Sequence, residues 1–175
     1  MQPEFEDFIA KWQSIAMRGG DFALPTRRDI TASAFADYLP SMLVAVWDFD
    51  ARDARNIYVG SRIEAAWRQD LSNVSLSATF KDPATAEFHV ELARAVTSNC
   101  VAALVEAELV FDDKLVLPIA QLRLPLAADN GQPVIMSLFL FPEVDSPLHG
   151  ALPTVQNMRH KFIDLKPADD LAAVI

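Results

Sequence analysis

The 175-residue chain has one cysteine, Cys100, and only five glycines. A single cysteine excludes an internal disulfide and is typical of proteins from a reducing compartment. No uninterrupted apolar run approaches the roughly 18 residues that a membrane-spanning helix needs. Because Glu4, Glu6 and Asp7 precede any apolar run, we expect no secretory signal and a cytoplasmic, soluble protein.

Basic residues are also few, with 15 Lys and Arg against 24 Asp and Glu, which leaves a net charge of −9. Binding to phosphate backbones depends on clustered Lys and Arg, so we expect no nucleic-acid partner. The same charge repels anionic membrane surfaces, so we expect no membrane partner either. A chain of this length forms about one domain and buries roughly 70% of its unfolded surface.

The signatures of common enzyme classes are missing as well. The sequence has no Gly-x-Ser-x-Gly, no His-x-x-x-His, no Cys-x-x-Cys and no phosphate-binding glycine loop. The spacing of His89, His149 and His160 does not fit a metal site. Glu106 and Glu108 share one side of an expected strand, but no acid–base partner accompanies them, which favours a solvated or edge position. We therefore expect no enzyme, no catalytic residue and no metal, with a small cavity enzyme as a remote alternative.

Residues 1–22 are predicted to form an N-terminal amphipathic helix. Five apolar side chains recur there at spacings of three and four: Phe5, Phe8, Ile9, Trp12 and Ile15. This stripe has two interpretations. It packs on the chain's own sheet, or it forms the seam of a homodimer and serves as the output element.

Residues 23–142 alternate between strand and helix patterns. The apolar run from Met42 to Phe49 and the segment Arg55–Gly60 predict a hairpin. Ser61 and Glu64 have the spacing of a capping box, which predicts a helix directly after Gly60. Asp82 and Pro83 predict the start of a second helix that extends to about Ser98.

From Cys100 onward the apolar period changes from 3.6 residues to two, which predicts three more strands. In the second of them, Leu122, Leu124 and Leu126 lie opposite Gln121 and Arg123. Asn130-Gly131 predicts the hairpin turn before the last strand, Val134–Phe141. Residues 143–175 are predicted to be a C-terminal tail, in which Val155, Met158 and Phe162 have the spacing of one short helix.

Several short motifs occur in an order that resembles the PAS_5 family of small bacterial PAS-domain proteins. They are Pro25-Thr26-Arg27-Arg28-Asp29-Ile30, Leu39-Pro40, Val59-Gly60-Ser61-Arg62-Ile63-Glu64, Asp70-Leu71-Ser72 and Leu124-Pro125-Leu126. The resemblance extends from about Trp12 to Phe141. It departs from the family at Ile57, where an arginine is frequent, and at Arg68 and Asn73, where glycines are usual.

The resemblance implies an α+β fold with a five-stranded antiparallel sheet, helices on one face and the N-terminal amphipathic helix. It implies a sensory or regulatory signal-transduction module that binds a small ligand or a signalling protein and relays a signal. The alternative is an adaptor with a filled core that binds proteins and no small molecule.

Candidate ligand-binding residues are Arg27, Asp29, Tyr58, Arg62, Trp67 and His89. Arg27 and Asp29 are either a polar handle at the pocket mouth or a structural ion pair or cap. Arg62 is near a helix N-terminus, which favours negative charge, and Trp67 is either core or a ligand platform.

The cofactor is left open, although two groups are disfavoured. His89 lies in the long helix where haem-sensing PAS domains carry their axial histidine, but a lone helical histidine more often fills a surface or core position. Asn99-Cys100 lacks the rest of a flavin photosensor motif, so we expect Cys100 to be a buried, inert thiol.

Overall fold

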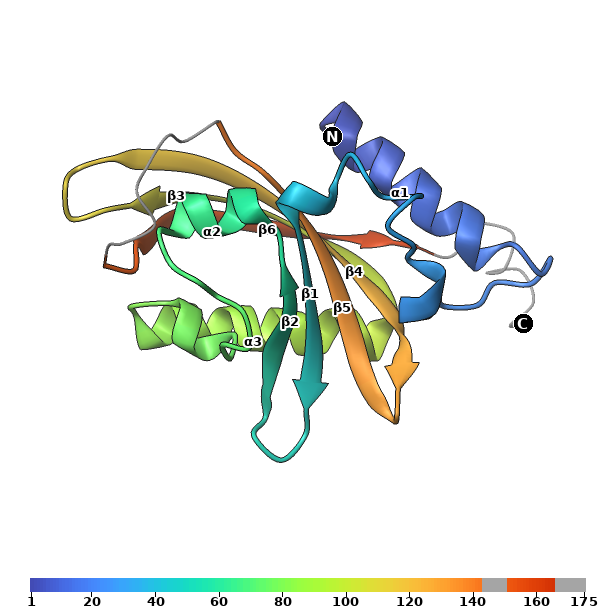
Figure 1. The fold of residues 1–175 in the computed structure, drawn as a ribbon. Coiled ribbons are helices and arrows are strands. Elements are labelled where there is room, and N and C mark those ends of the chain that lie inside the picture. The colour runs from blue at the N-terminus through green and yellow to red at the C-terminus, as the bar shows by residue number, and fades with distance from the viewer. Residues whose placement is uncertain (143–150, 166–175) are drawn as a thin grey trace.

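The computed structural model describes residues 1–142 and 151–165 and contains one antiparallel sheet in the order β2-β1-β5-β4-β3-β6 (Figure 1). The strands are β1 (Met42–Asp48), β2 (Asp53–Val59), β3 (Val101–Val110), β4 (Val116–Asp129), β5 (Gln132–Leu140) and β6 (Thr154–Asp164). The α-helices are α1 (Pro3–Ala16), α2 (Ser61–Trp67) and α3 (Pro83–Asn99), and the 3-10 turns are η1 (Arg27–Asp29), η2 (Leu39–Ser41) and η3 (Ser77–Thr79). The α+β class and all five predicted strands are confirmed.

The sixth strand, β6, corrects the prediction of a short helix around Val155, Met158 and Phe162. β6 pairs antiparallel with β3, and its register shifts where Asn157 adopts a positive φ of 51°. Such a bulge adds one residue to the strand, so Val155 and Met158, three positions apart, can pack against one apolar cluster. A bulged strand can therefore mimic helical spacing. β6 lies within the predicted tail of 143–175, whose residues 143–150 and 166–175 are outside the described residues.

Helices cover both faces of the sheet rather than one (Figure 1). On one face, α1 packs against alternate strand residues such as Leu122, Met136 and Leu138. On the other face, α2 and α3 pack against the intervening residues, such as Ile135 and Phe139. Successive strand residues point to opposite faces, so a sheet covered twice has few polar positions at its centre.

The apolar stripe of α1 packs on the chain's own sheet, which is the first of the two interpretations above. Phe5, Phe8 and Trp12 are at most 1% exposed. The Trp12 indole N–H donates to the Pro125 carbonyl oxygen on β4 at 3.0 Å. A homodimer in which α1 takes part stays a prediction, and with α1 in this position such a contact would use the helix's outer side.

The corner between β2 and α2 is capped differently from the prediction. Gly60, not Ser61, is the N-cap residue, and it makes no side-chain cap, so the predicted Ser61–Glu64 capping box is wrong. The chain instead passes very close to η2: a Cβ on Gly60 would lie 2.3 Å from the carbonyl oxygens of Leu39 and Pro40. A glycine is required here for close backbone approach rather than for its φ angle.

The predicted helix cap at Asp82 and the predicted hairpin turn at Asn130-Gly131 are confirmed. The Asp82 carboxylate caps α3 by accepting a hydrogen bond from the Thr85 backbone N–H at 2.7 Å. Asn130 and Gly131 have φ angles of 52° and 81°, as a tight hairpin turn requires.

Arg68 and Asn73, where the resemblance leads us to expect glycine, also have positive φ angles, of 56° and 62°. Glycine adopts this conformation without steric cost, whereas other residues adopt it less readily. Arg68 is held in it by an ion pair with Asp113 at 2.7 Å and by its position 4.6 Å above the Phe111 ring.

Candidate functional site

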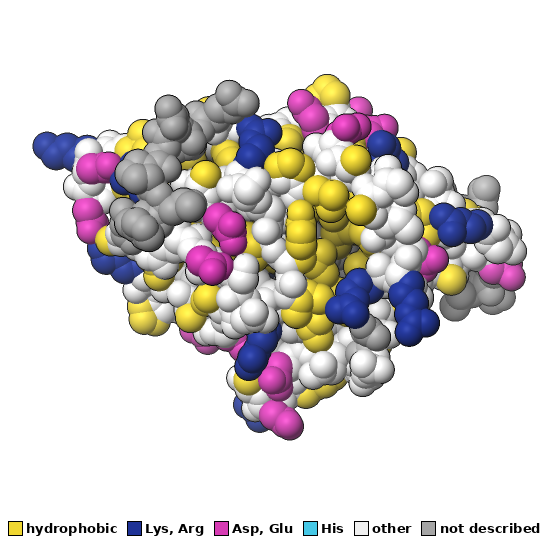
Figure 2. Space-filling model, viewed as in Figure 1, with side chains coloured by type: hydrophobic (Ala, Val, Ile, Leu, Met, Phe, Trp, Pro, Cys, Tyr) yellow, Lys and Arg dark blue, Asp and Glu magenta, His cyan; other side chains and the backbone are white. Residues whose placement is uncertain are grey.

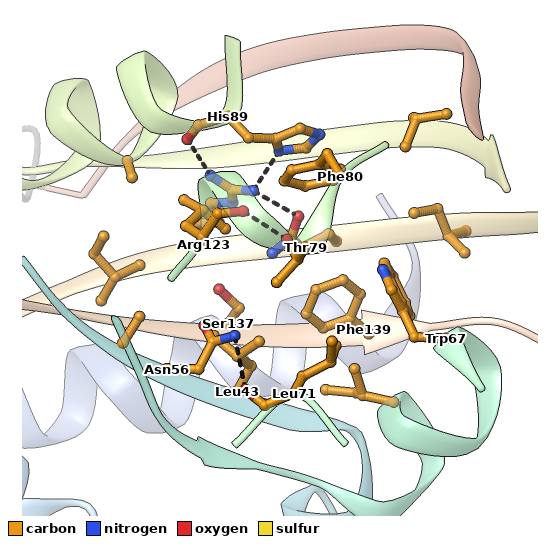
Figure 3. A pocket seen from close by; sticks show the side chains of 18 residues that line it. Leu43, Asn56, Trp67, Leu71, Thr79, Phe80, His89, Arg123, Ser137 and Phe139 are labelled. Carbon is orange, nitrogen blue, oxygen red and sulfur yellow. Dashed lines mark hydrogen bonds between the residues drawn. The ribbon is translucent and has the colours of Figure 1, made fainter. Parts of the chain in front are cut away.

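A small cavity lies between the sheet and the layer formed by α2, η3 and α3 (Figure 3). Its volume is about 30 Å³, which is room for an ordered water or for a ligand of a few heavy atoms. Most of its wall is apolar: Leu43, Ala45, Ile63, Trp67, Leu71, Leu76, Phe80, Ala93, Ile119, Ile135, Phe139 and Val155. The remaining wall is polar, and its residues come from β2, η3, α3, β4 and β5: Asn56, Thr79, His89, Gln121, Arg123 and Ser137.

Arg123 is the most unusual of these residues because its side chain is buried beneath α3. The residue is 2% exposed. Nη1 donates to the His89 carbonyl oxygen at 2.9 Å, and Nη2 donates to the Gln121 side-chain oxygen at 3.1 Å. Burial lowers the pKa of Arg123 to about 9, so the guanidinium stays protonated at neutral pH.

His89 accepts the third hydrogen bond of this group, from Arg123 Nη2 to its ring Nδ1. Burial first, and then the positive charge of Arg123, hold the pKa of His89 well below its usual value of 6.5. The ring is therefore neutral at pH 7, and a neutral imidazole has a nitrogen that can accept. Phe80 stacks on the ring with centroids 4.3 Å apart and planes inclined by 8°. The histidine therefore orients the guanidinium without neutralising its charge.

Three buried polar atoms of the cavity residues have no hydrogen-bond partner among the described residues. They are Asn56 Oδ1, Trp67 Nε1 and Arg123 Nε. Asn56 donates through Nδ2 to the Leu71 carbonyl oxygen at 3.3 Å, which leaves its oxygen unpaired. Figure 3 shows Asn56 and Trp67 on the wall that faces Arg123 and His89. The cavity thus combines one positive charge, unused donors and one unused acceptor.

Of the six candidate residues from the sequence, only Trp67 and His89 line this cavity. Trp67 is 4% exposed and packs edge-on against Phe139, with ring centroids 5.4 Å apart. Arg62 is exposed, with its guanidinium 5.6 Å from the centroid of the Phe141 ring, and lines a separate open groove. A ligand-binding role for these residues stays a prediction.

The remaining three candidates lie outside the cavity. Asp29 accepts hydrogen bonds from the Thr26 backbone N–H and hydroxyl, at 2.8 and 2.6 Å, and lies 3.8 Å from Arg18 after α1. This matches the structural reading of the Arg27–Asp29 segment, and Arg27 itself is exposed. Tyr58, on the edge strand β2, donates its hydroxyl to the Leu39 carbonyl oxygen at 3.0 Å.

The sequence reasoning missed Arg123, Gln121, Asn56, Thr79 and Ser137 as site residues. The usable signal was in β4, where Gln121 and Arg123 interrupt an otherwise apolar strand on one face. Polar residues at such positions are either solvent-exposed or part of a buried polar site. Deciding between the two requires knowing that α3 covers that face.

Two observations concern metal binding and membrane spanning. The described residues contain no group of three or more His, Cys, Asp or Glu side chains placed to hold a metal ion. Within the same residues, no helix has both the length and the apolar character needed to cross a bilayer.

Basic and acidic side chains are interspersed on the face shown in Figure 2, and an apolar strip lies over β1 and β5.

Comparisons with known proteins agree with the fold. A family model described as PAS_5, PAS domain, matches residues 1–139. This range includes α1, the cavity residues up to Phe139, the strands β1 to β4 and all of β5 except its last residue. No curated protein and no solved structure shows significant similarity to the chain.

Proposed function

The chain belongs to the PAS_5 family of PAS domains, and from that premise we propose that it senses a small ligand in the cavity and relays its presence to α1. PAS domains are generic sensory and signalling modules, so the ligand and the route of the signal are the specific parts of this proposal.

The unsatisfied polar atoms of the cavity are the observation that carries the proposal. A buried donor or acceptor without a partner costs about 1–3 kcal/mol. Asn56, Trp67 and Arg123 each have one such atom, and all three residues line the same cavity. Native proteins contain few such groups, and a cluster of them is typical of a site that a water or ligand completes.

The sheet offers a direct route from this cavity to α1. On β5, Ile135, Ser137 and Phe139 line the cavity, whereas Met136 and Leu138 pack in the cluster formed with α1. A ligand larger than the cavity has to displace part of its wall, and a close-packed interior transmits such displacements. Ligand binding would then shift the balance between two packings of α1 on the sheet.

The alternative is an adaptor that binds proteins and no small molecule. The small cavity volume, about 30 Å³, favours this alternative because most of the interior is already filled. β2 and β6 are the outer strands of the sheet, and an outer strand can pair with an extended segment of a partner.

Native mass spectrometry of the freshly purified full chain, followed by ligand-observed NMR with a library of small fragments, tests the proposal. A bound or saturably binding compound supports a sensor. In Ala45→Val, two methyl groups enter the cavity, so binding should be lost. Ala120→Val adds the same atoms on the α1 face and should leave binding unchanged. A chain that binds no fragment and pairs with a protein partner would support the adaptor.

A further inference from the structure

The buried Arg123 guanidinium has no counter-charge among the residues that the structure describes. It forms no ion pair within the described residues, and its three hydrogen bonds all go to neutral acceptors on His89 and Gln121. Other arginines of the described chain face carboxylates at the surface: Arg18 faces Asp29, Arg68 faces Asp113, and Arg94 faces Glu91. In the described part of the chain, the arginine most protected from water is thus one without an anion.

The hydrogen-bonding capacity of Arg123 is only partly used. A guanidinium has five N–H donors, and the described residues accept three of them. Nε is one of the two nitrogens with a donor left over. A buried charge is stable when it is both paired and hydrogen-bonded, and here the pairing is missing.

We propose that the cavity binds a small carboxylate anion, with Arg123 as its charged partner and Trp67 as a second donor. The ionised guanidinium can form a charge-assisted hydrogen bond to one carboxylate oxygen through its unused Nε–H, and the Trp67 indole N–H can donate to the other oxygen. The inference rests on the proposed sensory function and names the class of its ligand.

The opposite wall adds a further requirement. Asn56 Oδ1 is an acceptor without a partner, so it disfavours a second negative charge and suits a hydroxyl, an N–H or a bridging water. The ligand is therefore a monocarboxylate rather than a dicarboxylate. At about 30 Å³, the cavity limits the ligand to a molecule of about the size of formate or acetate.

The test uses the full chain labelled with ¹⁵N, in a buffer free of small carboxylates. Sodium formate and sodium acetate are titrated while the Arg123 Nε–H and Trp67 Nε1–H NMR signals are followed, with acetamide and sodium chloride as comparisons. We expect both signals to shift saturably with the carboxylates. Acetamide should bind roughly tenfold more weakly or worse, because hydrogen bonds to an ionised acceptor are about twice as strong as those to a neutral one.

Two variants and one control locate the binding. Arg123→Met keeps a side chain of similar length without the charge, and Ala45→Val fills the cavity while leaving Arg123 in place. Both should abolish the saturable effect, the first variant being followed at the Trp67 signal. Arg94→Met removes an exposed arginine of α3 and should leave the effect unchanged. If Arg123→Met does not fold, Ala45→Val and the acetamide comparison still decide.

Each result has one meaning. Loss of binding in every cavity variant that folds, Arg123→Met and Ala45→Val, with binding retained in Arg94→Met, supports the carboxylate site. Equal binding of acetamide or chloride, or acetate binding that survives in either folded cavity variant, overturns it. Saturable binding of a neutral fragment without any carboxylate binding overturns the inference and leaves the sensory proposal standing. Absence of all binding overturns both.

Discussion

Replacing Gly60 with alanine should destabilise the protein because of one contact between two backbone segments. Gly60 links β2 to α2, and a Cβ there would lie 2.3 Å from the carbonyl oxygens of Leu39 and Pro40. Both atoms belong to the backbone of η2, so no side-chain rotation can relieve the clash. The corner also positions Ile63 and Trp67 in the cavity wall, so a displaced corner would distort the proposed site.

Two opposing effects set the size of the change. Gly60 has φ −74° and ψ 145°, a conformation that alanine adopts freely, so the substitution lowers the entropy of the unfolded chain. That effect stabilises by about 0.4–1 kcal/mol. Forcing an extra carbon into a closely packed region costs about 1–3 kcal/mol or more, and here the contact is with fixed backbone. We expect a net loss of roughly 2 kcal/mol, with overpacking as the larger effect.

Gly19→Ala is the matched control. A Cβ at Gly19 would meet no atom within 4 Å, so the same substitution should leave stability unchanged or raise it by about 0.4–1 kcal/mol. Urea unfolding and thermal unfolding, each followed by circular dichroism, measure the stability of both variants. For a chain of this length, 1 kcal/mol corresponds to a Tm change of roughly 2–4 °C, so Gly60→Ala should melt about 4–8 °C below the wild type.

Equal stabilities for Gly60→Ala and Gly19→Ala would refute this reasoning. They would mean that η2 moves aside at no cost, and that the close approach at the corner is not a constraint on the fold.

Three further predictions concern other parts of the chain. Trp12→Phe keeps an aromatic ring in the α1 face of the core but leaves the Pro125 carbonyl oxygen without its indole donor, so urea unfolding should detect a loss of about 1–3 kcal/mol. His89 stays neutral in the folded protein, whereas in the unfolded chain it binds a proton below pH 6.5. Stability should therefore fall as the pH drops below 6.5, by up to about 1.4 kcal/mol per pH unit. His89→Gln should flatten that dependence. Asp82 has its pKa lowered by the hydrogen bonds from Thr85, so its contribution is present above the usual 3.8 and is lost as the pH falls through the lowered value; Asp82→Ala should lack this acid-sensitive component in thermal melts.

Each of these predictions can fail in a defined way. A Trp12→Phe variant as stable as the wild type would show that the indole hydrogen bond contributes nothing measurable. The burial argument for His89 would be wrong if the wild type and His89→Gln had the same pH dependence between pH 5 and 7. An Asp82→Ala variant that keeps the full acid dependence of the wild type would place its source in other carboxylates.

The candidate site was only partly predictable from the sequence, and the reason is visible in β4. The alternation of Leu122 and Leu124 with Gln121 and Arg123 showed which residues share a face. It could not show that α3 covers the polar face, since the pattern of α3 identifies its own apolar side and not the strand beneath it. Residue type alone predicts Trp67 and His89 as candidates. It predicts Arg27, Arg62 and Tyr58 on the same grounds, and these three lie outside the cavity.

Local sequence patterns were misleading where two structures share one spacing. Val155 and Met158 fit a helix or a bulged strand, and only pairing with β3 decided between them. Ser61 and Glu64 fit a capping box, but the close approach of η2 placed the N-cap at Gly60.

The sequence by itself determined the α+β class, the family, the five strands and the apolar stripe of α1. These depend on the period of side chains along one segment, which is a local property. The tertiary structure alone decided that β6 joins the sheet and that α1 and α3 cover opposite faces. It also decided that Arg123 is buried beside His89, with no described carboxylate to pair with it. Burial and charge compensation depend on which distant segments meet, and segments far apart in the chain meet only in the folded molecule.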